Sequence, residues 1–193
     1  INLGLFFCYF CRVMIEERQI LNQKDIQITI ERLCQQLIEH HGDFKNTVIV
    51  GVQPRGTFLS NRIIAKLKQL LKTTNFESGS LDISFYRDDL RRRDEPIVPE
   101  VMDMNLSLED KTVILVDDVL FTGRSIRSAI DALMAFGRPK SVELLTLIDR
   151  RFSRDVPIQP NYVGRTIDAI GSERVIVEWK EVNGKDRVLM VKS

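Results

Sequence analysis

Apolar residues recur at three- and four-residue steps along three stretches of the chain, which predicts three amphipathic helices. The first stretch ends near Gly42 and buries Ile26, Ile30, Leu33, Cys34, Leu37 and Ile38. The second runs from about Thr57 to Leu71 and buries Leu59, Ile63, Ile64, Leu67, Leu70 and Leu71. The third extends from about Gly123 to Phe136 and is ended by Gly137 and Pro139.

Short apolar runs alternate with these helices and predict strands. Residues 47–52, 112–116 and 142–148 are too apolar to have a solvated face, and residues 81–86 alternate as a half-buried strand does. The alternation of strands with helices indicates an α/β fold, with a doubly wound, mostly parallel sheet covered by helices on both faces.

The C-terminal part follows a different pattern. Residues 174–179 and 187–191 alternate between apolar and polar, and Asn183-Gly184 between them is a strong hairpin signal. This part of the chain is therefore predicted to form a small β hood over the α/β core.

The first fourteen residues do not fit the core, because they are apolar and carry no charge before Arg12. A membrane-spanning helix needs roughly 20 apolar residues and a secretory signal needs a basic leader, and this stretch has neither. We interpret residues 1–13 as an upstream extension and residues 14–193 as a single domain, and expect no contact with a membrane.

Composition excludes some classes of protein. The chain has 193 residues, 44% of them apolar, and 28 basic against 27 acidic side chains leave a net charge of +1. Because no global field favours polyanions, any anion site must be local. Three cysteines are an odd number, which does not suit a disulfide framework, and one short of a four-thiolate zinc site, so a reducing, cytoplasmic location is favoured.

The candidate chemistry lies in residues 116–125, with the sequence Val-Asp-Asp-Val-Leu-Phe-Thr-Gly-Arg-Ser. Asp117 and Asp118 follow an apolar strand, at the edge where open α/β sheets bind ligands, and are expected at its solvated end. The turn with Thr122, Gly123 and Ser125 opens a helix, so hydroxyls and free N–H groups suit a phosphate. Carboxylates repel phosphate but accept hydrogen bonds from a ribose diol. A solvated turn and an ordinary helix cap explain each half of the motif separately, but not their combination.

This motif resembles the phosphoribosyl pyrophosphate (PRPP) signature of type I phosphoribosyltransferases. Together with residues 82–90 and 137–139, this motif resembles the corresponding segments of the pyrimidine-operon regulators that also act as uracil phosphoribosyltransferases. The resemblance covers the chain from about Leu21 onward. It implies transfer of ribose 5-phosphate from PRPP to uracil, giving UMP and pyrophosphate, with Mg²⁺, in a homodimer or larger homo-oligomer.

The resemblance also implies a role for individual residues. Asp117 and Asp118 would hold the ribose hydroxyls, and through the substrate the metal, while Arg55 would act on the leaving pyrophosphate. The implied PRPP-binding residues are Thr122, Gly123, Arg124, Ser125, Gly56 and Arg87. Residues 87–103 resemble the lid that closes over pyrophosphate. Arg150 and Val175 are the candidates for base binding, whereas His40 and His41 are expected to face solvent.

Two alternatives remain open. A purine-base phosphoribosyltransferase shares the core, but its usual Glu-Asp pair differs from Asp117-Asp118. The other alternative is an RNA-binding attenuator that senses uridine nucleotides and binds an mRNA leader. Residues 137–154 carry a local charge of +3 from five basic and two acidic side chains, among them Arg150, Arg151 and Arg154. In the RNA-binding proteins that this chain resembles, the first helix carries a threonine and a histidine four residues apart. This chain has Glu31 and Gln35 at those positions, and a carboxylate there would repel RNA.

Overall fold

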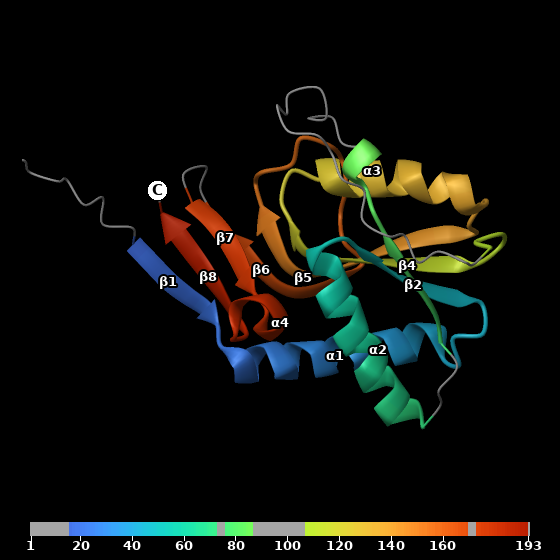
Figure 1. The fold of residues 1–193 in the computed structure, drawn as a ribbon, viewed down its shortest axis with the longest axis horizontal. Helices are drawn as coiled ribbons and strands as arrows, with labels where there is room; N and C mark the ends of the chain where they lie inside the picture. The colour runs from blue at the N-terminus through green and yellow to red at the C-terminus, as the bar shows by residue number, and fades with distance from the viewer. Residues whose placement is uncertain (1–15, 73–75, 87–106, 170–172, 193) are drawn as a thin grey trace, which may run out of the picture.

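The structure is a computed structural model that describes residues 16–72, 76–86, 107–169 and 173–192 (Figure 1). Its central sheet has five parallel strands in the order β3-β2-β4-β5-β6. The strands are β2 (Thr47–Val52), β3 (Glu77–Leu81), β4 (Thr112–Leu120), β5 (Ser141–Arg151) and β6 (Tyr162–Asp168). The predicted parallel sheet is confirmed, and β6 is a strand that the hydrophobic pattern did not reveal.

Helices cover both faces of this sheet, as predicted. α1 (Gln23–His41) and α2 (Arg55–Leu71) contact each other on one face, and α3 (Arg124–Leu133) lies on the other (Figure 1). A capping box between Asn22 and Asp25 begins α1. Each face has its own apolar cluster, one beneath α1 and α2 and one beneath α3. Burial of these two helix stripes holds the layers together.

The predicted β hood is present as a separate antiparallel sheet in the order β1-β8-β7. It consists of β1 (Glu16–Leu21), β7 (Glu173–Glu178) and β8 (Arg187–Lys192). The predicted hairpin is confirmed, because β7 and β8 pair antiparallel, and its connection contains the single turn of α4 (Lys180–Asn183) ended by Gly184. The Asn183 side chain accepts a hydrogen bond from the Trp179 N–H at 3.2 Å, which favours this connection.

The strand predicted over residues 81–86 is wrong. Strand β3 ends at Leu81, and Ser84–Tyr86 forms a 3₁₀ turn. The carboxylate of Asp82 accepts the Ser84 N–H at 2.8 Å, so a local side-chain hydrogen bond bends the chain where alternation suggested extension.

The two histidines at the end of α1 do not simply face solvent. The Tyr162 hydroxyl donates to Glu143 at 2.7 Å, and it lies 2.9 Å from His40 Nδ1 and 3.0 Å from His41 Nε2. The His41 side chain is only 9% exposed. The prediction that His41 faces solvent is therefore wrong. Its ring forms hydrogen bonds to Glu143 and Tyr162, at the amino ends of β5 and β6, instead of to water.

No helix in the described part of the chain is long and apolar enough to cross a membrane. The predicted upstream extension of residues 1–13 and the lid of residues 87–103 lie outside the described residues.

Candidate active site

Asp117 and Asp118 are buried within β4 rather than placed on a solvated strand end. Strand β4 continues to Leu120, and Asp117 stays in the ladder opposite Thr146 of β5. The two residues are 9% and 7% exposed. The expectation of a solvated pair is wrong because the ladder between β4 and β5 extends past both carboxylates.

Burial changes the acidity of both groups. Burial and the charge of Asp118 raise the pKa of Asp117 well above its ordinary value. Burial also raises the pKa of Asp118, against the lowering effect of the Arg55 guanidinium. The Asp118 N–H donates to Asp117 Oδ1 at 2.9 Å, while Asp118 Oδ2 is buried with no hydrogen-bond partner among the described residues. An orphaned buried acceptor of this kind fits a ligand that donates a hydrogen bond.

Arg55 and Gly56 begin α2 just after β2 ends, which brings both to the edge that carries the carboxylates. Arg55 is exposed, and its charge acts on both Asp117 and Asp118. A Cβ at Gly56 would lie 2.4 Å from the Val116 carbonyl oxygen and 3.1 Å from Asp117 Cα. Gly56 is therefore required for close packing of α2 against β4, in addition to the predicted room for phosphate oxygens.

The turn between β4 and α3, residues 120–125, contains the residues predicted to bind phosphate, and we name it the phosphate turn. It lines a pocket of about 290 Å³. The pocket is lined by Asp117, Val119, Leu120, Phe121, Thr122, Gly123, Arg124, Ser125, Ile126 and Ser128. Gly123 has a φ of +85°, and a Cβ there would lie 2.7 Å from Val156 Cγ2. The turn thus needs glycine for both conformation and space, and it leads into the first N–H groups of α3, which suit an anion.

The two residues predicted to bind the base do not line this pocket. Arg150 is 4% exposed, and its guanidinium lies 3.9 Å from the ring centroid of Phe121 and donates to the Glu173 carbonyl at 2.8 Å. Val175 is half-buried against the apolar cluster beneath α1 and α2. Arg150 therefore reaches the pocket only through Phe121, which the motif contained but sequence reasoning did not single out. Arg87 lies outside the described residues.

The arginines predicted as a basic RNA footprint are largely used within the protein. Arg150 is buried, Arg151 pairs with Asp168 at 2.8 Å, and Arg154 pairs with Asp149. Arg150 and Arg154 therefore contribute little to a basic footprint, because a carboxylate and backbone carbonyls take up their guanidinium groups, whereas Arg151 stays exposed beside Asp168.

The described residues contain no group of three His, Cys, Asp or Glu side chains able to hold a metal ion by themselves. Asp117 and Asp118 nevertheless fit a Mg²⁺ ion that arrives with a substrate. Mg²⁺ keeps phosphate and water ligands and needs only one or two protein carboxylates. Within the described ranges, the two carboxylates form an acceptor pair rather than a closed metal cage.

A parallel sheet with paired carboxylates and a glycine-containing turn at its carboxyl edge is the arrangement that the sequence motif predicts for a phosphoribosyltransferase. The family model described as the phosphoribosyl transferase domain matches residues 17–180. Among solved structures, a hypoxanthine phosphoribosyltransferase from Staphylococcus aureus superposes with a TM-score of 0.67 at 22% identity, covering 91% of this chain and 92% of that one. That level of identity supports the fold alone.

Curated relatives narrow the class. The bifunctional protein PyrR of Clostridioides difficile is 39% identical over 176 residues, covering 91% of this chain and 98% of the relative. The bifunctional protein PyrR of Ligilactobacillus salivarius is 42% identical over 180 residues, covering 91% and 98%. The chain belongs to the PyrR family of phosphoribosyltransferases.

Proposed function

We propose that this protein transfers ribose 5-phosphate from PRPP to uracil, forming UMP and pyrophosphate. One observation carries the proposal: buried Asp117 and Asp118 stand beside a glycine-containing turn at the start of α3. A phosphate on residues 122–125 and a ribose diol on the carboxylates match the two ends of a ribose 5-phosphate unit.

The proposed chemistry needs no covalent nucleophile. As pyrophosphate leaves, positive charge develops on the ribose ring, and the carboxylates of Asp117 and Asp118 stabilise it from fixed positions. Asp118 Oδ2 accepts a ribose hydroxyl, and Arg55 lies where it can attract the departing pyrophosphate. Bound with the substrate, Mg²⁺ would neutralise charge on the leaving group.

Uracil is proposed rather than a purine because the curated relatives at 38–42% identity are PyrR proteins. The hypoxanthine enzymes reported above share the fold at much lower identity. The decisive experiment measures initial rates with PRPP and Mg²⁺ and with uracil, hypoxanthine or guanine in parallel, identifying the nucleotide by chromatography. UMP as the main product supports the proposal, and IMP or GMP as the main product contradicts it. Transfer should stop on chelation of Mg²⁺ and return when it is restored.

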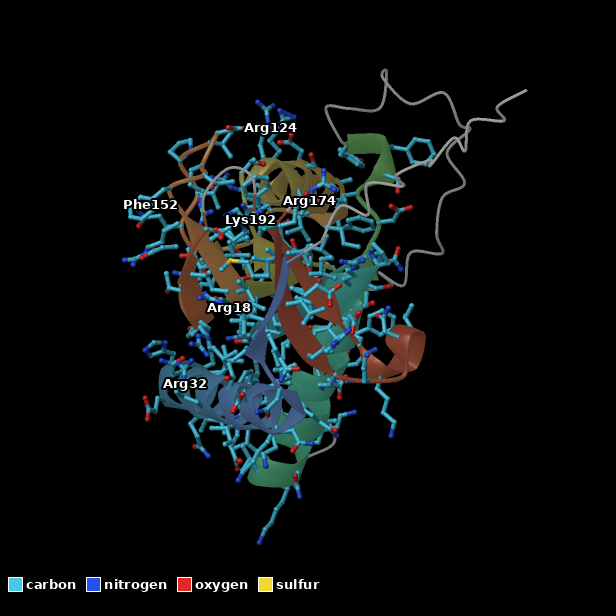
Figure 2. All side chains as sticks on the ribbon, turned by 90° about the vertical axis from the view of Figure 1, so that its left-hand side faces the viewer. Arg18, Arg32, Arg124, Phe152, Arg174 and Lys192 are labelled. Carbon is cyan, nitrogen blue, oxygen red and sulfur yellow. The ribbon has the colours of Figure 1, made fainter. Side chains whose placement is uncertain are left out.

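A second candidate, binding of an mRNA leader, is favoured by a surface that sequence reasoning missed. Figure 2 shows Arg18, Arg32, Arg174 and Lys192 along one face, and all four are exposed. Phe152 appears at the edge of the same view, with 85% of its surface exposed. Basic groups and an exposed aromatic ring on one face suit a single-stranded loop.

Binding should be measured for a pyrimidine-leader hairpin and a scrambled hairpin at physiological salt, with and without UMP. A selective, UMP-dependent complex would support the regulatory role. Equal, weak binding that falls steeply with salt would indicate only nonspecific attraction, and this is the outcome we expect. The reason for this expectation is Glu31, which is exposed on α1, the helix that carries Arg32, and pairs with Lys66 at 3.0 Å. A carboxylate at this position repels RNA phosphates.

A further inference from the structure

A short segment after β5, residues 154–158, contacts the back of the turn between β4 and α3. The Arg154 guanidinium donates through Nη1 to the carbonyl oxygens of Leu120 (3.3 Å) and Phe121. The same group donates to Arg150 O at 2.9 Å, and its Nε donates to Ile158 O at 3.0 Å. One side chain thus joins the turn, the end of β5 and the segment itself.

The backbone of the segment holds the next residue of the turn. The N–H groups of Asp155 and Val156 both donate to the Thr122 carbonyl, at 2.9 and 3.3 Å. The Val156 and Ile158 side chains pack where Gly123 has no Cβ. Three consecutive carbonyls of the turn, from Leu120 to Thr122, are therefore bonded to one segment.

Peptide geometry turns this arrangement into an orientation of donors. The described residues contain one cis peptide, Gln53-Pro54, so the peptides from 120 to 123 are trans. In a planar trans peptide the N–H points opposite to the C=O. With three carbonyls held by residues 154–156, the N–H groups of Phe121, Thr122 and Gly123 point away from that segment. The pocket lies there, because its lining includes these three residues and none from 154–158.

We propose that Arg154 is a positioning residue for PRPP, which fixes the backbone N–H groups of the phosphate turn without touching the substrate. This inference rests on the proposed function, because it takes the turn as the site of the 5-phosphate. N–H donors that are already aligned bind phosphate without the cost of ordering a loop.

The shape of the side chain matters more than its charge. Arg154 pairs with Asp149, so its positive charge is largely neutralised. Its planar group donates to four carbonyls in several directions at once, which the single ammonium of lysine does not reproduce. Arg154→Lys therefore keeps the charge while removing the fork.

The test compares Arg154→Lys with Arg151→Lys, a matched control at the end of β5 whose guanidinium pairs with exposed Asp168. PRPP binding is measured by calorimetry in Mg²⁺ without a base, and KM and kcat are measured with uracil. We expect Arg154→Lys to raise the Kd and KM for PRPP by ~10-fold or more, with kcat and the KM for uracil within about threefold of wild type. Arg151→Lys should match wild type.

Unchanged PRPP affinity in folded Arg154→Lys overturns the proposal. So does a loss of thermal stability in which PRPP and uracil parameters worsen equally, because that pattern indicates a structural role alone. If Arg154→Lys does not fold, Asp149→Ala decides the question by the same measurements, since Asp149 holds Nη2 and its loss lets the guanidinium turn away from the carbonyls of Leu120 and Phe121. A selective rise in the Kd for PRPP then supports the proposal, and an unchanged Kd overturns it. Wild-type protein that binds no PRPP would instead contradict the proposed function itself.

Discussion

The backbone N–H of Asp118 donates to Oδ1 of Asp117 at 2.9 Å, while Asp118 Oδ2 stays buried without a hydrogen-bond partner among the described residues. The backbone thus orients the carboxylate of Asp117, whereas Asp118 keeps one oxygen that can accept a further hydrogen bond. Such an arrangement is unfavourable for the unliganded protein, because a buried acceptor without a donor loses its hydration. A ribose hydroxyl would remove that cost when substrate binds.

Replacing both carboxylates, Asp117→Asn with Asp118→Asn, should lower the rate of uracil transfer by at least ~100-fold, through loss of fixed negative charge beside the ribose ring. The amide is nearly the same size as the carboxylate, so the fold should remain. Asp131→Asn serves as the control, because Asp131 pairs with Arg127 on the exposed face of α3. Near-normal turnover by the double variant would contradict the assignment of the pair to ribose.

The single variant Asp117→Asn should be more stable than wild type at neutral pH. The pKa of Asp117 is raised in the folded protein above its ordinary value of 3.8, so the folded state binds the proton more tightly than the unfolded state. Ionised Asp117 therefore destabilises the fold above its folded pKa, and protonation removes that penalty as pH falls. Thermal unfolding from pH 8 to pH 4 should show the advantage of the variant shrinking toward pH 4. A constant difference across this range would be inconsistent with a raised pKa.

Gly56→Ala should destabilise the protein by about 1–3 kcal/mol, because the new Cβ is forced against the Val116 carbonyl. It should also reduce transfer, since the displaced strand carries Asp117. Gly184→Ala is the comparison: Gly184 has a φ of +74° with nothing within 4 Å of an added Cβ. That variant should lose about 1 kcal/mol from backbone strain alone and keep full activity. Equal activity in the two variants would show that Gly56 serves stability only.

Tyr162→Phe should lower stability by about 1–2 kcal/mol, because Glu143 and the two histidines lose the hydroxyl they share. The cluster lies at the amino ends of β5 and β6, the opposite edge of the sheet from Asp117. We therefore expect unchanged KM values for PRPP and uracil, measured below the unfolding transition. A selective change in either KM would indicate coupling between the two edges.

Local patterns in the sequence determined most of the fold. Helices α1 and α2 are identified by apolar residues that recur every three or four positions. Strands β2, β4 and β5 are identified by short, continuous apolar runs. The edge strand β3 has the sequence Glu-Ser-Gly-Ser-Leu, and its half-buried pattern carries no such signal. Strand β1 is exposed along most of its described length and is defined by pairing with β8, about 170 positions later in the chain.

The site divides in the same way. The sequence alone determined that two carboxylates and a phosphate turn follow one apolar strand, because strand, motif and helix are contiguous in residues 112–133. Only the tertiary structure decided that the carboxylates are buried, that Gly56 packs behind Asp117, and that Arg154 belongs to the phosphate turn. Each of these depends on contacts between segments roughly 30 to 60 residues apart, and the sequence pattern reports only near neighbours. The sequence of a run of arginines does not distinguish whether they face RNA, a carboxylate or a backbone carbonyl. The packing of the chain decides among these partners.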